Sequence, residues 1–158
     1  MKVELTTMVM IENAETKEVL VQNRKLKWKG YSFPGGKVEA GENFYDCAVR
    51  EIKEETGLTV TNLKSCGVVH WYNRDSGDRY LVFLYKTDCY SGTLITDSPE
   101  GDHFWCSRGE ISEMPRDKFS NELLSYCHLY FGEKFSEVYI PWHTDEKTGK
   151  QQVEIIFK

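Results

Sequence analysis

The stretch from residue 43 to residue 57, NFYDCAVREIKEETG, constrains this chain most because both of its ends carry helix signals. The side-chain oxygen of Asn43 can accept from the first free amides of a helix, and Asp46 stands three residues later as a capping-box partner. Gly57 can end the helix, since glycine adopts the left-handed backbone conformation without steric cost. The sequence therefore predicts one helix over residues 44–56.

Glutamates lie on the face of this helix that should be buried. At about 100° per residue, one apolar sector of the helix is formed by Phe44, Cys47, Ala48 and Ile52. Glu51 and Glu55 fall inside that sector, and Glu54 lies on its flank. Buried carboxylates are costly, and acidic neighbours three and four residues apart repel each other. The glutamates must therefore hold protons or share a cation, unless the helix is simply a solvated, charged one.

A cation shared by these carboxylates would be a hard one. Carboxylate oxygens suit Mg²⁺ or Mn²⁺, and the surrounding sequence offers no histidine and cysteine cluster for a softer metal. Arg50 can reach Glu54 across one helical turn and steady the cluster. Upstream, Gly35 and Gly36 allow the backbone to approach a ligand closely, with Lys37 beside them as a phosphate partner. The glycine turn and the acidic helix together indicate a site for a cation and a phosphate.

The remainder of the chain is rich in strand patterns. One hairpin is predicted over 3–12 and 17–24, a second over 66–73 and 79–90, and a short strand over 103–107. A second amphipathic helix is predicted over 121–131, followed by a hairpin that turns at DEKTGK. This order predicts an α+β sandwich in one domain, 1–158, with residues 132–158 as a C-terminal hairpin extension. That extension can lengthen the sheet or pair with a second chain.

Composition excludes several classes of protein. The net charge is −5, so no basic face attracts duplex nucleic acid or an anionic membrane, and a polyanionic substrate needs a cation or a local cluster of Lys and Arg. The five cysteines form no Cys-x-x-Cys pair, which argues against a disulfide framework or a zinc site. No stretch reaches the ~20 apolar residues of a membrane span, and the first residues are too acidic for a signal peptide. We therefore expect a cytoplasmic protein.

The segment from Gly36 to Leu58 resembles the sequence box of the Nudix hydrolases. That box reads Gly, five residues, Glu, seven residues, then Arg-Glu-apolar-x-Glu-Glu-x-Gly-apolar. Its fixed positions are filled here by Gly36, Glu42, Arg50, Glu51, Ile52, Glu54, Glu55, Gly57 and Leu58. The resemblance implies an α/β/α sandwich with a mixed central sheet across roughly residues 3–131. It also implies Mg²⁺-dependent hydrolysis of a nucleoside diphosphate linked to another group X.

The same resemblance implies roles for residues at the matching positions. Glu54 and Glu55 become metal ligands, Glu51 a metal ligand or water activator, and the carbonyl of Gly35 a further ligand. Arg50 becomes the residue that orients this catalytic cluster. Bound metal ions neutralise phosphate charge and lower the pKa of the attacking water, and a nearby carboxylate can take its proton. Which glutamate acts as the base is left open.

The stretch SFPGGK, the chain length and EGDHFW resemble the MutT branch, in particular the small bacterial 8-oxo-dGTP diphosphatases. This implies hydrolysis of an oxidised guanine nucleoside triphosphate to the monophosphate and pyrophosphate. For an additional metal-binding carboxylate, DSPEGDHFW offers Glu100 as first choice and Asp102 as second. Asn121 can bind a purine edge with its two-sided amide, unless it only caps the helix. Phe33, Trp28 or Tyr31 can stack a base, unless these aromatic residues only pack against the core.

Differences between this sequence and the motifs of other Nudix branches narrow the choice of substrate. The chain has no proline between Pro34 and Pro99, where ADP-ribose pyrophosphatases usually carry one. Residues 74–76 lack the tyrosine that marks dinucleoside polyphosphate hydrolases. Two alternatives stay open, an RNA 5′-end pyrophosphohydrolase and a domain that only binds nucleotides, although binding-only members typically lose a box glutamate. The expected partner is a nucleotide, not duplex nucleic acid or a membrane, and the expected state is a monomer or homodimer.

Overall fold

A mixed sheet forms the middle layer of the computed structural model, which describes all residues, 1–158. Its six strands follow the order β1-β6-β5-β9-β10, with β11 also pairing with β9. The strands are β1 (Val3–Ile11), β5 (Lys64–Asn73), β6 (Arg79–Thr87), β9 (Ser136–Thr144), β10 (Gln151–Val153) and β11 (Ile156–Phe157). β1 is parallel to β6 and β9 is parallel to β5, whereas the other neighbours are antiparallel. The predicted mixed sheet is confirmed, as is the hairpin of β5 and β6.

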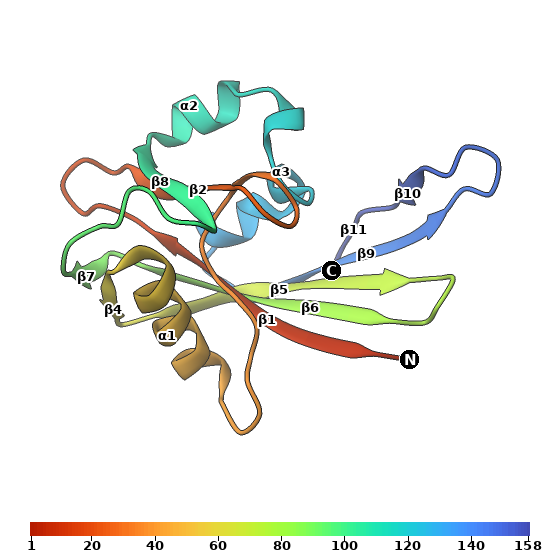
Figure 1. Ribbon diagram of the computed structural model, residues 1–158, viewed down its shortest axis with the longest axis horizontal. Coiled ribbons are helices and arrows are strands. Elements are labelled where there is room, and N and C mark those ends of the chain that lie inside the picture. The colour runs from red at the N-terminus through yellow and green to blue at the C-terminus, as the bar shows by residue number, and fades with distance from the viewer.

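Helix α1 (Phe44–Thr56) covers one face of this sheet (Figure 1). The side chain of Asn43 caps its first turn, and Gly57 ends it in the left-handed conformation with φ 76°. Ala48 and Ile52, both fully buried, join a core that also contains residues of β1 and β6. The helix therefore has the bounds and caps that the sequence predicts.

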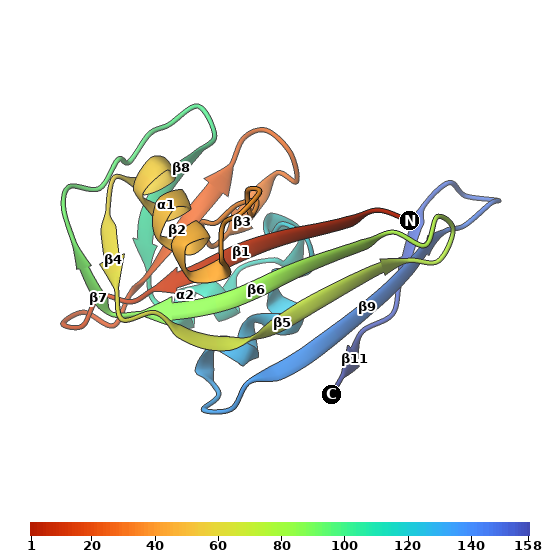
Figure 2. The same ribbon diagram turned by 90° about the horizontal axis from the view of Figure 1, so that it is seen from below.

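The opposite face carries smaller elements and the larger core. The smaller elements include a three-stranded sheet of β3 (Gly30–Ser32), β2 (Val19–Arg24) and β8 (Gly101–Cys106). They also include the helices α2 (Arg108–Glu113) and α3 (Leu123–Tyr126) and 3₁₀ turns over Arg116–Lys118 and Cys127–Phe131. A separate pair of strands, β4 (Thr59–Thr61) and β7 (Cys89–Ser91), lies beside α1 (Figure 2). Helices thus lie on both sides of the sheet, which confirms the expected α/β/α sandwich.

The first predicted hairpin, 3–12 with 17–24, is wrong in its pairing. β1 pairs with β6, while β2 pairs with β3 and β8, and only a single bridge between Glu12 and Val19 joins the two segments. Val19, Leu20 and Val21 are all at most 2% exposed, so β2 is buried on both of its faces. A strand buried on both faces contributes to both cores, which an outer position beside β1 would not permit.

The second predicted helix, 121–131, is broken into shorter pieces. Asn121 and Glu122 both have positive φ, 45° and 57°, so a helix cannot begin before Leu123. After one α-helical turn the segment tightens into a 3₁₀ helix that ends at Phe131. Leu123 and Cys127 are buried as predicted, but Phe131 is 42% exposed. The apolar spacing therefore identified two core positions correctly, but it predicted an α-helix longer than the one that forms.

The C-terminal hairpin turns at Asp145–Lys150 as predicted, and it extends the central sheet through the parallel pairing of β9 with β5.

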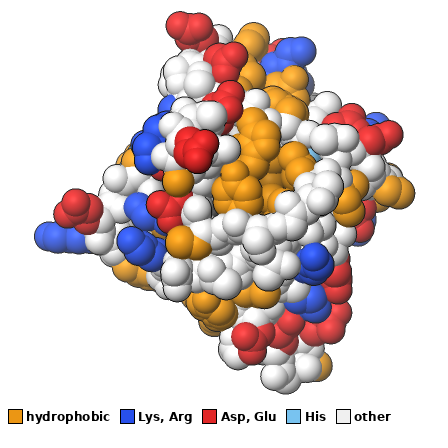
Figure 3. All heavy atoms as spheres, turned by 90° about the vertical axis from the view of Figure 1, so that its left-hand side faces the viewer, with side chains coloured by type: hydrophobic (Ala, Val, Ile, Leu, Met, Phe, Trp, Pro, Cys, Tyr) orange, Lys and Arg blue, Asp and Glu red, His pale blue; other side chains and the backbone are white.

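Hydrophobic side chains reach the surface at the end of the molecule that carries β4 and β7 (Figure 3). Among the partly buried aromatic residues near these strands, Tyr90 and Trp105 have ring centres 5.4 Å apart. No helix has the length and apolar character needed to cross a membrane.

Candidate active site

The glycine turn before α1 is pressed against β1. The amide of Val9 donates to the carbonyl of Pro34 over 2.9 Å, and that of Thr7 donates to the carbonyl of Gly36 over 2.8 Å. A Cβ atom on Gly35 would lie 2.1 Å from the carbonyl oxygen of Thr7. Since that atom belongs to the backbone of a strand, it cannot yield, and only glycine fits at this position.

Both glycines also meet the glutamates of α1. The amide of Gly35 donates to Oε2 of Glu55 over 3.1 Å. A Cβ atom on Gly36 would lie 2.2 Å from the carboxyl carbon of Glu51. The turn therefore places backbone atoms directly beside two of the predicted catalytic carboxylates.

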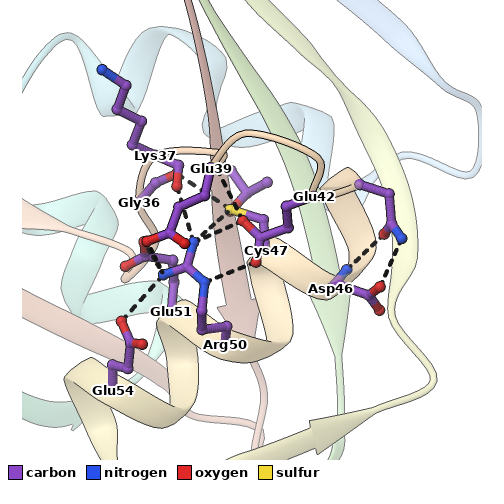
Figure 4. A network of polar contacts seen from close by, with 11 residues as sticks. Gly36, Lys37, Glu39, Glu42, Asp46, Cys47, Arg50, Glu51 and Glu54 are labelled. Atoms are coloured by element: carbon purple, nitrogen blue, oxygen red, sulfur yellow. Dashed lines mark hydrogen bonds and ion pairs between the residues drawn. The ribbon is translucent and has the colours of Figure 1, made fainter.

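Arg50 holds the acidic side chains together (Figure 4). Its guanidinium donates twice to Glu42, over 2.8 Å for each bond. It also donates to Glu51 over 2.8 Å, to Glu54 over 3.2 Å, and to the backbone carbonyl of Lys37 over 3.1 Å. The planar fork of arginine suits such a set of fixed acceptors, whereas a lysine could not satisfy them all.

The role of Glu42 is one that the sequence reasoning missed. Glu42 was recognised as a fixed position of the box, but no function was assigned to it. Its two hydrogen bonds from Arg50, and then one from the amide of Glu39, lower the pKa of its carboxyl to about 2. Glu42 therefore stays ionised and anchors Arg50, which leaves the rest of the guanidinium for Glu51 and Glu54. The only signal was its fixed distance from Arg50, eight residues away.

Glu55 lies in a very different electrostatic environment. Burial, and then a hydrogen bond shared with the neighbouring carboxyl of Glu100, raise the pKa of Glu55 to about 8. Burial also raises the pKa of Glu51, against the opposing effect of Arg50. Two neighbouring carboxyl groups in such a place must share a proton or a cation. The structure thus brings Glu100 to Glu55, as the first choice of the sequence analysis expected.

A cleft of about 220 Å³ opens beside this acidic pair. It is lined by Glu55, Glu100, Gln22, Arg24, Leu26 and Lys27. Gln22 is only 1% exposed, yet its Oε1 atom has no hydrogen-bond partner. Two carboxylates and an unsatisfied amide oxygen are hard donors, and they fit Mg²⁺ or Mn²⁺ by their chemistry. No three acidic, histidine or cysteine side chains are close enough to hold one ion in common, so the fit rests on donor type.

The other predicted residues are placed unequally. Lys37 is largely exposed, and its Nζ atom lies 3.4 Å from Glu4, close to the glycine turn. The predicted role of Phe33 in stacking a base is wrong. Its side chain is 1% exposed and its ring packs edge-on against Tyr130, so no base can reach it. Asp102, the second choice as a metal ligand, forms an ion pair with Lys25 instead.

Asn121 lies away from the acidic cluster, in the wall of a pocket of about 350 Å³. Three tryptophans, Trp28, Trp71 and Trp142, line the same pocket. Sequence reasoning considered only Trp28, because these side chains are scattered along the chain and no local pattern connects them. The molecule therefore presents an acidic cleft and a separate aromatic pocket.

Comparison with known proteins identifies relatives of this chain. The family model described as the NUDIX domain matches residues 2–127. An uncharacterized Nudix hydrolase of Bacillus subtilis, YvcI, is 30% identical over 116 residues, which cover 71% of this chain and 72% of that protein. An ADP-ribose pyrophosphatase of Methanocaldococcus jannaschii is 31% identical over 111 residues, covering 68% of this chain and 63% of that protein.

A solved structure has the same architecture over nearly the whole chain. The MutT protein of Bacillus halodurans superposes with a TM-score of 0.72 and 24% identity. The match covers 96% of this chain and 97% of that one, so it includes the C-terminal hairpin. At this identity the likeness concerns the fold alone.

Proposed function

The chain belongs to the Nudix hydrolase family, and on that premise we propose that it hydrolyses a nucleoside triphosphate, such as an oxidised guanine nucleotide, to the monophosphate and pyrophosphate. Nudix hydrolases are pyrophosphohydrolases that act on phosphoric anhydrides, and they generally use divalent metal ions. The single observation that carries the proposal is the acidic pair of Glu55 and Glu100 in a cleft that also contains Arg24 and Lys27.

The residues that would hold divalent cations between them are the five of the sequence analysis: Gly35, Glu51, Glu54, Glu55 and Glu100. In this arrangement no single ion would take three of the carboxylates. A bound Mg²⁺ or Mn²⁺ supplies charge neutralisation at the phosphate oxygens and a lower pKa for the attacking water. Because the pKa of Glu55 is raised by burial and by Glu100, this pair holds a proton that a divalent cation can replace. Their cost of burial is then offset when substrate and metal are bound.

The protein's own groups position the remaining chemistry. Arg50 fixes the carboxyl of Glu51 through a 2.8 Å hydrogen bond, and Gly36 allows that carboxyl to lie against the backbone. A carboxylate held in this way can accept the proton of a water that attacks the phosphate chain. Arg24 and Lys27 line the same cleft and offset the negative charge of the phosphates, and Lys37 adds a further exposed cation nearby.

Two observations bear on the substrate. The similarity to an ADP-ribose pyrophosphatase makes ADP-ribose the second candidate, since that substrate also contains a phosphoric anhydride. The absence of a proline between Pro34 and Pro99 favours the triphosphate. The amide of Asn121 faces an aromatic pocket suited to a base, and both candidates carry a base.

A substrate panel with identified products tests the proposal. The purified protein with Mg²⁺ is given 8-oxo-dGTP, dGTP, dCTP, ADP-ribose and triphosphorylated RNA, and products are separated by anion exchange. Monophosphate plus pyrophosphate from a free triphosphate, with the highest kcat/KM in the panel, is the expected result. Faster turnover of ADP-ribose or of the RNA would replace the substrate assignment, and no turnover of any compound would favour a binding-only domain. In ¹⁸O-labelled water, the labelled product identifies the phosphorus that is attacked.

A further inference from the structure

The aromatic pocket is built largely from flat side chains. Trp28 comes from the β2–β3 loop, Trp71 from β5 and Trp142 from β9, with Tyr80 of β6 in edge contact with Trp28 at 5.5 Å. Its volume of about 350 Å³ lies at the lower end of the range for small-molecule sites. Indole faces placed around a space of this size favour a flat aromatic ligand that can stack.

Two wall residues adopt backbone conformations that bulky side chains rarely take. Trp28 has φ 48° and Asn121 has φ 45°. The hydroxyl of Ser120 donates to the carbonyl of Trp28 over 2.6 Å and thereby joins the two segments. Such conformations persist only where the surrounding structure enforces them, and they concentrate at ligand sites. Asn121 lines both this pocket and the one next to it, so its side-chain amide is placed where it can meet a ligand.

The C-terminal hairpin supplies part of this pocket. Trp142 of β9 and Gln151 of β10 line it, and both lie beyond residues 2–127, which the family model matches. The hairpin is attached firmly to the turn between β5 and β6. Arg74 forms an ion pair with Glu154 over 2.7 Å, and the amide of Arg74 donates to the carbonyl of Trp142 over 2.8 Å. The wall is therefore held in a fixed position against the rest of the pocket.

Short contacts and chain neighbours link residues of the pocket to the acidic cluster and to the cleft. Glu4 lines the pocket and lies 3.4 Å from Nζ of Lys37. The backbone carbonyl of Lys37 in turn accepts from Arg50, the centre of the acidic cluster. On the other side, Lys27 of the cleft directly precedes Trp28 of the pocket. Because Lys27 and Trp28 are consecutive residues, the cleft and the pocket meet at one loop.

We propose that the C-terminal hairpin is a specificity element, whose Trp142 and Gln151 form one wall of the pocket that receives the nucleobase. This inference rests on the proposed hydrolysis of a nucleotide and adds which part of the chain selects the base. Trp142 supplies a stacking face, and Gln151 an amide for the base edge opposite Asn121. A purine offers a larger stacking surface and more edge atoms than a pyrimidine, so the pocket favours purines.

Two variants and one control test the hairpin. Trp142→Ala removes the stacking face, and Gln151→Ala removes an exposed side chain with little effect on folding. Trp105→Phe is the control, because Trp105 is the one tryptophan outside the pocket. The preference for dGTP over dCTP, as a ratio of kcat/KM values, should fall by about tenfold or more in Trp142→Ala and by less in Gln151→Ala. The ratio should not change in the control.

A binding assay separates this inference from the proposed function. In wild type and in Trp105→Phe, dGMP should quench tryptophan fluorescence more strongly than dCMP, and Trp142→Ala should bind dGMP about tenfold more weakly. Binding of pyrophosphate with Mg²⁺, followed by calorimetry, should be unchanged in all variants. If the wild type hydrolyses triphosphates but both hairpin variants keep the wild-type dGTP preference and dGMP affinity, the inference is overturned. If no triphosphate is hydrolysed, the proposed function fails, and loss of dGMP binding in Trp142→Ala still supports the base pocket.

Discussion

The acidic cluster around Arg50 and the aromatic pocket are built in opposite ways. The cluster takes its groups from one short segment, the glycine turn and helix α1, with Arg50 bonded to several of them directly. The pocket takes single residues from segments spread over the whole chain, including the hairpin at its end. On the proposed function, the groups assigned to the chemistry are thus concentrated locally, whereas those assigned to substrate selection are distributed over the fold.

The largest expected effect comes from a substitution in the acidic cluster that leaves the aromatic pocket unchanged. Glu54→Gln should lower kcat by about 10² to 10⁴-fold for every triphosphate, since the proposed metal ligand is lost whichever base is present. Affinity for dGMP, measured by fluorescence, should stay near the wild-type value, because the aromatic pocket is untouched. Glu113→Gln, an exposed residue of α2, is the control. Unchanged turnover of all substrates in Glu54→Gln would remove the catalytic assignment of this cluster.

The next effect concerns the centre of the cluster. Arg50→Lys cannot replace the paired hydrogen bonds to Glu42 and the bonds to Glu51 and Glu54. The free energy of unfolding, measured in urea, should fall by about 2 kcal/mol, and kcat should fall by about 10²-fold. Arg116→Lys, whose partner Glu122 lies 3.3 Å away at the surface, should change neither. Equal stability of the two variants would contradict the structural role of Arg50.

A smaller effect separates activity from stability within the glycine turn. In Gly36→Ala the added Cβ would displace the carboxyl of Glu51, which is the far end of a flexible side chain and can move. The melting temperature should therefore change little, while kcat should fall about tenfold because Glu51 no longer lies against the turn. Gly109→Ala serves as control, since the nearest atom to its Cβ is 3.9 Å away. A large loss of stability without loss of kcat would show that Gly36 matters for folding alone.

The smallest expected effect is a change in melting temperature with pH and metal. The pKa of Glu55 is raised from 4.5 to about 8 on folding, so between these values the folded protein holds a proton that the unfolded chain releases. Stability without metal should therefore fall as pH rises through this window. Mg²⁺ replaces the proton, so it should raise the melting temperature by a few degrees more at pH 8.5 than at pH 6. Calorimetry with EDTA or Mg²⁺ measures both trends.

Glu55→Gln provides the matched variant for that experiment. Its amide carries no titrating proton, so both the pH trend and the additional stabilisation by Mg²⁺ should be reduced. A wild-type protein whose stability without metal rises between pH 6 and pH 8 would argue against the raised pKa of Glu55.

The contrast between cleft and pocket also explains what the sequence could predict. Helix α1, its caps and the placement of Glu51 and Glu55 depend on neighbours within a few residues, so periodicity was sufficient. Neither the parallel pairing of β1 with β6 nor the separate sheet around β2 leaves such a local trace, and the predicted first hairpin was therefore wrong. The left-handed backbone at Asn121 broke a helix that apolar spacing alone had indicated.

The candidate site divides in the same way. The glutamates, Arg50 and Gly35 belong to one segment, and their expected roles remain proposals that the geometry supports. Glu100 could be ranked above Asp102 only weakly, because the contact with Glu55 spans two elements. Phe33 looked accessible from its position beside the box, yet the fold turns its ring into the core. Trp71 and Trp142 were missed, since only the packed sheet brings them to one pocket.

The parallel pairing of β9 with β5 has a consequence for biosynthesis. A ribosome releases β9, the second partner of β5, after every element except β10 and β11. Until then β5 has an open edge, and pairing across such a long separation in sequence forms slowly. The nascent protein can thus assemble the acidic cluster of α1 early, but the hairpin wall of the proposed base pocket is added only after β9 and β10 have emerged. A message cut short before β9 would yield a chain that keeps the glutamates of α1 and lacks Trp142 and Gln151.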